Sequence, residues 1–535
     1  MPPFAERAGS DTAVSDPLIV HPLGGLDAIG TSSFLLDDGE TAILIDAGRS
    51  FPSSGGLLVP ESPLLDKALP RLAALACTHG HFDHAAAVSL ILEGAPRCTV
   101  LASEETIAFL SIRYGLPAEA RTRKVRHASS ERFGRFTLTA LRVEHSIPGA
   151  LAWLVEHERG SILYTGDFSG MPAETRDILG EKHIGLAFCD CTNAPIPRPG
   201  PGEADVVAGI GDWIGRHADG RVLMTTFSSN LGRIKAALAA GRQAGMLLFV
   251  DGEAMLGAIG IIRSLDRDAV RGVAALEGSL PESPALILAS GCQGEESSAF
   301  MRLLSGASSL TDRDAIVISA SPVPGNEEDW RAMLRLAASS RASLAVPPLE
   351  PVHASGHAVR PVLGEIIGCI RPRILVPVHG DAFQRRALAG LGTECGIKTV
   401  LPGNGDQVRW DEVPGLVFLG NSLQSGKHRR LPEVGAYERS LMARHGVACF
   451  VLRLNPPSGF AHVSLTMRGC LRADQHQKDL ESLRDACEVE ILDGYQSGTL
   501  GMSAIRRKIQ AWAELELEER FGLRPLVIVS LVNES

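Results

Sequence analysis

The sequence lacks the features of membrane-bound, secreted or disulfide-stabilised proteins. Its first twenty residues contain acids, prolines and polar residues but no basic start followed by an apolar stretch, so we expect no secretory signal. No apolar run approaches the roughly 18 to 20 residues that span a bilayer. Ten cysteines are scattered without a Cys-x-x-Cys pair, which argues against a zinc ribbon or a redox couple. These absences predict a soluble, cytoplasmic protein with reduced thiols and no membrane partner.

Positive charge is also in short supply. The formal net charge is −10, and the isoelectric point is near 5.9. A protein that binds nucleic acid over its whole surface by counterion release needs a positive net charge. Bound divalent cations would add local positive charge that this sum ignores. The charge therefore excludes a broadly basic surface and leaves a locally positive channel open.

Length and texture predict several domains. A chain of 535 residues is too long for one hydrophobic core and, at roughly 150 residues per domain, fits about three. Short apolar strands separated by Gly-rich turns give way, after a Pro/Gly stretch at residues 194–202, to alternating strands and helices. We predict five segments: the first part of an α/β domain at 1–205, an α/β insert at 206–350, the second part of the first domain at 351–425, a linker at 426–440, and a small α/β domain at 441–535.

Within the predicted insert, three units read as strand, small-residue loop and helix. Their strands lie at 221–227, 285–290 and 315–320, and each is followed by a loop rich in Ser, Gly or Asn. In a parallel sheet such loops lie at the carboxyl ends of the strands, where backbone N–H groups and helix N-termini bind anions. The insert is therefore predicted to contribute an anion site.

The strongest chemical signal is the string Thr-His-Gly-His-Phe-Asp-His at residues 78–84, directly after an apolar strand. Three imidazoles and one carboxylate this close repel one another or need partners unless a cation holds them together. The string therefore predicts a metal site. The pair Cys189 and Cys191, in contrast, shares one face of a strand and is better explained by a core or site-lining role than by metal binding.

The His-x-His-x-Asp-His string resembles the signature of the metallo-β-lactamase fold. The order of that fold's ligands matches His145 after a strand, Asp167 in the string YTGDF, and His379 at the end of ILVPVHG. The resemblance implies two divalent metal ions, with mixed imidazole and carboxylate ligands that suit Zn²⁺ and also allow Mn²⁺. It places Asp46 at a position that orients ligands. The implied ligands are His79, His81 and His145 for one metal, Asp83, His84 and His379 for the other, and Asp167 between them.

The placement of the insert between Asp167 and His379 resembles the β-CASP subfamily of nucleases, and nearly the whole chain is similar to ribonuclease J. The matching strings, in chain order, are GGLDAIG, THGHFDH, HSIPGA, TGDF, DCTNA, TFSSN, GCQGE, SPVPGNE, VHASGHA and PVHGD. The resemblance implies an αββα sandwich with an inserted β-CASP domain and a small C-terminal α/β domain. It also implies RNA as partner and a homodimer or homotetramer assembled through the C-terminal domain.

The resemblance also implies a mechanism, through the residues that match the subfamily's motifs. Asp190, His357 and His379 match the subfamily's acidic first motif and its two histidine motifs. Water activated at the metals would attack phosphorus, with Asp83, Asp190 and His357 as the catalytic residues. His357 would protonate the leaving 3′ oxygen, or alternatively only position the phosphate. A pocket for a 5′ monophosphate would be formed by Ser229, Asn230, His353, Ala354, Ser355, Gly356 and His357.

The implied activity is 5′-to-3′ exonuclease action on 5′-monophosphate RNA together with endonuclease action, in RNA processing and decay. The alternatives are a weakly active RNA-binding partner subunit and a hydrolase of DNA or of a small ester. Departures from the family pattern are Asp27 and Ala28 in GGLDAIG, Ser169 in place of a lysine, and Asp381 in place of a glutamate. The run KHRR at 427–430 is explained either by RNA contact or by a solvated linker.

Overall fold

The structure is a computed structural model that describes residues 18–26, 29–50, 62–306, 310–323, 326–410, 417–419, 447–455, 460–468, 477–496, 502–521 and 526–533. Contacts divide these residues into two compact units, one up to residue 419 and one from residue 447 onward. The predicted linker at 426–440, with its KHRR run, lies outside the described residues. Among the described helices, none is both long and apolar enough to cross a membrane.

The first sheet of the larger unit has eight strands in the order β21-β20-β1-β2-β3-β4-β5-β6. The strands β3, β4, β5 and β6 run parallel, and this parallel half carries the His-rich string after β4. The bounds are β1 Leu18–Gly24, β2 Ser33–Asp37, β3 Ala42–Ile45, β4 Leu72–Ala76, β5 Thr99–Ala102, β6 Arg121–Lys124, β20 Gln407–Trp410 and β21 Val417–Leu419.

The second sheet has seven strands in the order β19-β18-β11-β10-β9-β8-β7. The strands β10, β11 and β18 are parallel neighbours, so their carboxyl ends meet at one edge although β18 is far along the chain. The bounds are β7 Ser130–Phe133, β8 Phe136–Arg142, β9 Leu151–His157, β10 Gly160–Tyr164, β11 Ile184–Asp190, β18 Ile374–Val378 and β19 Lys398–Thr399.

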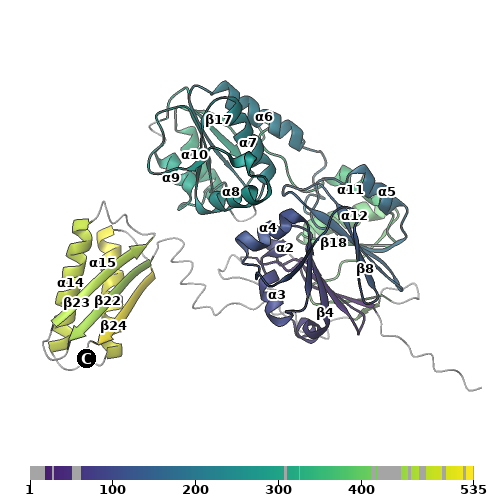
Figure 1. Cartoon of the computed structure of the whole chain (residues 1–535), viewed down its shortest axis with the longest axis horizontal. Coiled ribbons are helices and arrows are strands. Elements are labelled where there is room, and N and C mark those ends of the chain that lie inside the picture. The colour runs from purple at the N-terminus through teal and green to yellow at the C-terminus, as the bar shows by residue number, and fades with distance from the viewer. Residues whose placement is uncertain are drawn as a thin grey trace, which may run out of the picture. The chain divides into compact units, whose positions relative to one another are not determined.

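The two sheets pack face to face. Phe34 from the first sheet and Phe136 and Trp153 from the second are buried in one apolar cluster between them. Helices cover both outer faces: α1 Pro63–Ala68, α3 Val88–Gly94 and α4 Glu104–Arg113 on the first sheet, and α5 Ala173–Gly180, α11 Arg360–Ile370 and α12 Ala382–Glu394 on the second. Figure 1 shows α5, α11 and α12 together on one side of this sandwich. The predicted αββα layering is confirmed.

The insert is a separate parallel sheet with helices on both faces. The strand order is β14-β13-β15-β12-β16-β17, and every pair is parallel. The strands are β12 Arg221–Thr226, β13 Leu247–Asp251, β14 Val273–Ala275, β15 Ala285–Ala289, β16 Ala315–Ser319 and β17 Ser343–Ala345. One face packs on α6 Glu203–Arg216, α7 Leu231–Gln243 and α8 Glu253–Leu265, and the other on α9 Ala299–Ser305 and α10 Glu327–Ala338.

The insert contains more elements than the three predicted units. Strands β13, β14 and β17 and helices α6 and α8 were not predicted. The helix after β15 begins at Ala299, because the hydroxyl of Ser298 caps it by accepting from the N–H of Met301 at 3.3 Å.

The second unit is a three-stranded sheet with two helices. The strand order is β23-β22-β24, with β22 Val447–Asn455, β23 Phe460–Arg468 and β24 Leu526–Asn533. The helices α14 Gln477–Gln496 and α15 Met502–Phe521 pack on the sheet through Leu483, Ala513 and Phe450. All domain boundaries drawn from the sequence remain predictions.

Candidate metal centre

Seven potential ligands lie at the ends of strands on the same edge of the sandwich. His79 and His81 follow β4, and Asp83 and His84 lie in α2, Phe82–Ala85. His145 follows β8, Asp167 follows β10, and His379 follows β18. Because these strands belong to two sheets packed face to face, the sandwich brings side chains together from segments up to about 300 residues apart in sequence.

The first group is His79, His81 and His145. Nδ1 of His81 lies 3.0 Å from Nε2 of His79 and 3.1 Å from Nε2 of His145. Burial and the neighbouring imidazoles hold the pKa of all three histidines below the usual value, to about 3 for His81 and about 4 for His145. All three rings are therefore neutral near pH 7, the form in which an imidazole nitrogen can bind a metal.

The second group is Asp83, His84 and His379. Nε2 of His379 lies 2.9 Å from Oδ2 of Asp83, and Nε2 of His84 lies 3.8 Å from the same oxygen. Nε2 of His84 is buried and makes no well-aligned hydrogen bond within the described part of the chain. A buried polar atom normally has a partner, so this nitrogen fits a site for a cation.

Asp167 joins the two groups. Its Oδ2 lies 3.3 Å and 3.5 Å from Nε2 of His84 and of His379. The same oxygen lies 3.8 Å and 3.9 Å from Nε2 of His79 and of His145. Although burial alone would raise the pKa of Asp167, His379 and His84 hold it well below its usual value. An ionised oxygen between two groups of ligands suits a position shared by two cations.

In all five histidines, one ring nitrogen faces the centre and the other is hydrogen-bonded outward. An outer partner of this kind fixes which nitrogen is free for a metal. The outward contacts are His79 Nδ1 to Thr78 Oγ1 at 2.9 Å, His81 Nε2 to Ser229 Oγ at 3.1 Å, His84 Nδ1 to Asp46 Oδ2 at 2.7 Å, His145 Nδ1 to the carbonyl of Gly356 at 2.6 Å, and His379 Nδ1 to Thr192 Oγ1 at 2.9 Å. The residues present thus fit two divalent cations.

Two residues of the centre have a left-handed backbone. Asp46 and His379 both have φ of 59°, which side chains other than glycine rarely adopt. The surrounding hydrogen bonds stabilise these conformations: the N–H of Asp46 bonds to the carbonyl of Ala76 at 3.0 Å, and that of His379 to the carbonyl of Gly25 at 2.8 Å. Such strain is concentrated at functional sites, where it aims a side chain.

His357 and Asp190 form a pair beside the metal ligands. Nδ1 of His357 donates to Oδ2 of Asp190 at 2.8 Å, and the ring of His357 stacks 5.4 Å from that of His379. Burial alone would lower the pKa of His357, but the nearby Asp190 raises it to about 9. The carboxylate of Asp190 also accepts the N–H and the hydroxyl of Thr192, at 2.9 Å and 2.7 Å. Asp190 therefore stabilises the protonated form of His357.

Residues 353–357 form a loop that is held from both sides. Asn193 donates to the hydroxyl of Ser355 at 2.9 Å and to the carbonyl of His357 at 3.1 Å. Gly356 lies so close to the centre that a Cβ there would be 2.8 Å from the ring of His145. The neighbour that Gly356 approaches so closely is thus a potential metal ligand, and its predicted part in a phosphate pocket stays a prediction.

Two of the predicted phosphate contacts have other partners in the structure. The side chain of Asn230 caps α7 by accepting from the N–H of Arg233 at 3.0 Å. His353 accepts from Arg233 at Nδ1, at 2.8 Å, and lies 3.1 Å from the hydroxyl of Ser321 at Nε2. Ser229 lies against His81 as described above, while Ala354 and Ser355 line the cleft beside the centre. The phosphate roles of all these residues remain predictions.

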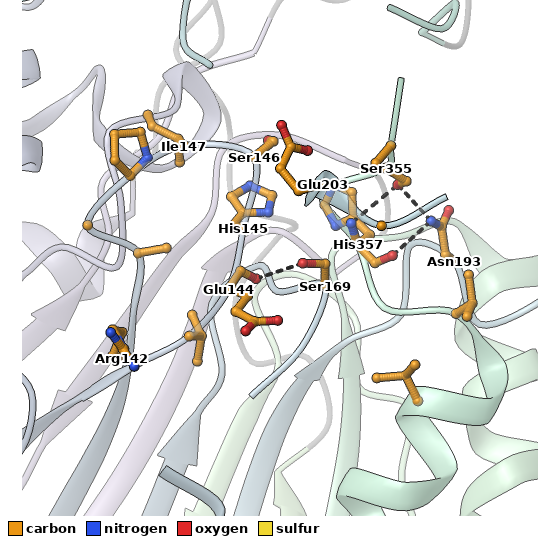
Figure 2. Close-up of a pocket in the computed structure, with 18 of the residues that line it drawn as sticks. Arg142, Glu144, His145, Ser146, Ile147, Ser169, Asn193, Glu203, Ser355 and His357 are labelled. Atoms are coloured by element: carbon orange, nitrogen blue, oxygen red, sulfur yellow. Dashed lines mark hydrogen bonds between the residues drawn. The ribbon is translucent and has the colours of Figure 1, made fainter. Parts of the chain in front are cut away.

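A cleft of about 980 Å³ opens beside the centre. His145 and His357 lie next to each other in its middle, Asn193 and Ser355 lie toward one end, and Arg142 lies toward the other, as Figure 2 shows. Glu203, at the start of α6, also lines it. Because the cleft reaches the potential ligand His145 and is open to solvent, it can admit part of a substrate.

The structure shows contributors that sequence reasoning missed. Thr78, Thr192 and Asn193 bond to potential ligands or to the loop, and buried Arg233 forms an ion pair with the half-exposed Glu203 beside it. Thr78, Thr192 and Asn193 stand within motifs that the sequence analysis already quoted. Their position next to predicted site residues could therefore have indicated them. The partners of Arg233 lie far away in sequence, and no local pattern reveals them.

The sequence departures have local explanations where they are described. Asp381 caps α12, with its carboxylate accepting from the N–H groups of Phe383 and Gln384 at 2.8 Å and 3.0 Å. Aspartate is a preferred capping residue, which accounts for it at this position. The hydroxyl of Ser169 bonds to the carbonyl of Glu144 at 3.2 Å on the wall of the cleft. Asp27 and Ala28 lie outside the described residues.

Comparisons with known proteins agree with this geometry. Residues 219–336 match the family model described as Ribonuclease J, beta-CASP domain, and residues 41–225 match the Beta-lactamase superfamily domain. A solved structure titled as a protein of unknown function from Enterococcus faecalis V583 shares the fold, with a TM-score of 0.53 at 17% identity, covering 74% of this chain and 100% of that one.

Two curated relatives named Ribonuclease J carry the comparison further. The one from Mycobacterium tuberculosis (strain CDC 1551 / Oshkosh) is 33% identical, over 77% of this chain and 78% of its own. The one from Mycolicibacterium smegmatis is 28% identical over 99% of this chain and 100% of its own. With an inserted β-CASP domain in a metallo-β-lactamase sandwich and identity at this level across most of its length, the chain belongs to the ribonuclease J family.

Proposed function

We propose that this member of the ribonuclease J family, a metal-dependent ribonuclease, uses two divalent ions to cut RNA. It would act as a 5′-to-3′ exonuclease on ends that carry a monophosphate and as an endonuclease elsewhere. The observation that carries the proposal is the position of Oδ2 of Asp167 between two groups of His and Asp ligands, directly beside the pair of His357 and Asp190.

The distances between the side chains support a division of the ligands between two ions. His79, His81 and His145 would hold one ion, and Asp83, His84 and His379 would hold the other, with Asp167 shared. Two divalent ions in such a site, Zn²⁺ or Mn²⁺, supply water activation and stabilise the charge on both the attacking and the leaving oxygen of a phosphodiester. The chain contributes imidazoles whose orientation is fixed by outer hydrogen bonds, so no reorganisation of the rings is needed before the substrate enters.

His357 is suited to protonate the leaving 3′ oxygen. Its Nδ1 is held by Asp190, which supports the form of the ring that also carries a proton at Nε2. Asp190 itself is fixed by Thr192, so the pair cannot rotate freely. The alternative, in which His357 only positions the phosphate, predicts that a glutamine at this position retains most of the activity.

The 5′ monophosphate would lie between Ser229 and the loop at 353–357. Nδ1 of His81 faces the centre, so its Nε2–H donates to Ser229 and leaves the hydroxyl hydrogen of Ser229 free to donate to a phosphate oxygen. Ser355 lines the cleft, and its hydroxyl, which accepts from Asn193, keeps a hydrogen to donate to a second phosphate oxygen. This pocket is composed mainly of neutral donors, in keeping with the acidic balance of the chain.

The test uses one 5′-labelled RNA prepared with either a monophosphate or a triphosphate end, incubated with the protein and Zn²⁺ or Mn²⁺. We expect labelled mononucleotide from the monophosphate RNA, internal fragments from the triphosphate RNA, and no products with the His81→Ala variant. Intact RNA in both preparations would contradict the proposal. Binding without cleavage would favour a partner subunit, and cleavage of DNA or of a small ester alone would favour the other hydrolase.

We also propose that the unit at residues 447–533 assembles the chain into a dimer or tetramer, as the resemblance to the family implies. The support is that this unit is compact by itself, with its own apolar core. Light scattering of the full chain and of a chain that ends at residue 425 tests this assignment. The same number of chains per particle in both proteins would contradict it.

A further inference from the structure

We propose that buried Arg233, paired with Glu203, positions the loop at residues 353–357, and through that loop sets the orientation of His145 and His357. The inference rests on the proposed function, because it concerns the same centre. Arg233 and Glu203 belong to the insert, on α7 and α6, whereas the centre is formed by the sandwich. The pair would thus make Arg233 a positioning residue that links the insert to catalysis.

All the donors of Arg233 are used. The side chain is only 1% exposed. Its Nε and Nη2 donate to the two carboxylate oxygens of Glu203, each at 2.7 Å, in a bidentate pair. A buried guanidinium destabilises the fold unless it is paired and fully hydrogen-bonded. We therefore expect the contacts of Arg233 to be needed for the local structure.

Two further donors of Arg233 hold the start of the loop, and the last one donates from Nη1 to the carbonyl of Ser319 at 3.5 Å. Nη1 also donates to Nδ1 of His353 at 2.8 Å, and Nη2 donates to the carbonyl of Ala354 at 2.7 Å. Because arginine has no acceptor, Nδ1 of His353 must accept, and its Nε2–H then points to Ser321 at 3.1 Å. His353 is held at both ring nitrogens and acts as an anchor of the loop.

The end of the loop is held from the sandwich. Asn193 bonds to Ser355 and to the carbonyl of His357, as described above. Between the two anchors lies Gly356, whose carbonyl accepts from Nδ1 of His145 at 2.6 Å and so keeps Nε2 of His145 toward the centre. Release of the first anchor would let this carbonyl move, and His145 would lose the partner that orients it.

Two variants test the proposal. Arg233→Met removes all five donors with little change in volume, and Glu203→Gln removes the charge partner at a side chain that is 49% exposed and therefore tolerant of change. We expect both to weaken the binding of one of the two Zn²⁺ ions, by about 10- to 100-fold for Arg233→Met and less for Glu203→Gln. The affinity is measured by titration against a chelating dye, without RNA.

Kinetics provide the second readout. For a positioning role, kcat on 5′-monophosphate RNA falls while KM stays near that of the wild type, since the substrate does not touch Arg233. A rise of KM that is confined to monophosphate RNA, with wild-type Zn²⁺ affinity, would overturn the proposal and make Arg233 a phosphate ligand. Wild-type Zn²⁺ affinity together with wild-type kcat in Glu203→Gln or in folded Arg233→Met would overturn it as well.

Arg221→Met is the matched control. Arg221 pairs with Asp314 at 2.7 Å in the same insert, but it lies at the start of β12, whereas the loop that leads to Ser229 lies at the end of that strand. We expect a lower unfolding midpoint with unchanged Zn²⁺ affinity and kcat. If Arg233→Met does not fold, Glu203→Gln decides. If the wild type fails to cleave RNA, the proposed function fails, while the Zn²⁺ titrations still test the positioning role.

Discussion

His145 donates its Nδ1 hydrogen to the carbonyl oxygen of Gly356 across 2.6 Å, although the two residues are separated by 211 positions. A Cβ at residue 356 would lie 2.8 Å from Cε1 and Nδ1 of His145 and 2.8 Å from the hydroxyl of Ser146. Real side chains do not tolerate such distances, so a larger residue must push the loop or the imidazole away. The contact between the loop at residues 353–357 and His145 therefore depends on glycine at position 356.

The Gly356→Ala variant should bind Zn²⁺ about 10- to 100-fold more weakly and lose a comparable factor in kcat, because His145 is displaced from the centre. Metal content after dialysis and initial rates on RNA measure both effects. Gly368→Ala is the control, since nothing lies within 4 Å of a Cβ at that helical position. Equal metal content in the two variants would show that Gly356 has no part in holding His145.

Asp167→Asn should abolish the binding of both ions, because one oxygen of Asp167 faces both groups of histidines. The amide keeps the shape but removes the charge that balances two cations. We expect fewer than one bound metal per chain by elemental analysis and no detectable cleavage. Asp212→Asn, at an exposed ion pair with Arg216, should retain two metals. One firmly bound metal in Asp167→Asn would show that the carboxylate is not shared.

Thr192→Val should weaken the metal site that includes His379. The hydroxyl of Thr192 lies 2.9 Å from Nδ1 of His379 and 2.7 Å from Asp190, so its removal leaves Nδ1 of His379 without this partner and takes one of several hydrogen bonds from Asp190. We expect about 10-fold weaker binding of one ion and a lower kcat. Thr192→Ser retains the hydroxyl and should behave as the wild type. If Ser and Val variants bind metal equally, the methyl group rather than the hydroxyl matters.

His21 should make the fold sensitive to mild acid. It is buried in β1, its Nδ1 has no hydrogen-bond partner among the residues that the structure describes, and burial lowers its pKa to about 4 despite the nearby Asp37. The unfolded chain takes up this proton near pH 6.5, but the folded chain does so only near pH 4, so stability falls as the pH drops between these values. The loss attributable to His21 reaches about 3 kcal/mol at the acid end and is absent above pH 7.

The His21→Phe variant should therefore unfold at nearly the same urea concentration at pH 7.5 and less readily than the wild type near pH 5. Both proteins are measured in EDTA, so that release of metals in acid does not contribute. A parallel decline of the two proteins with falling pH would show that other groups account for the acid sensitivity.

Local order in the sequence predicted a metal site at residues 78–84, whereas the fold class and the ligands His145, Asp167 and His379 came from the resemblance to a known fold. An apolar strand that ends in His or Asp places that side chain at a sheet edge whatever the rest of the chain does. The strand and helix at residues 247–265 carried the same signal, with the apolar run LLFVD before Gly252, and could have been predicted. The caps at Asn230 and Ser298 set the residues at which α7 and α9 begin, which the run of helical residues alone did not show.

The tertiary structure decided what these side chains do. In sequence, His81, His145 and His379 are three histidines at the ends of strands; in the structure, Ser229, Gly356 and Thr192 determine which of their nitrogens faces the centre. Those partners come from segments that lie between about 150 and 210 residues away, and hydrogen bonds between such distant groups leave no periodic pattern in the chain. The sequence alone thus determined which residues can bind metal, and packing of the sandwich, insert and loop decided how each one is oriented.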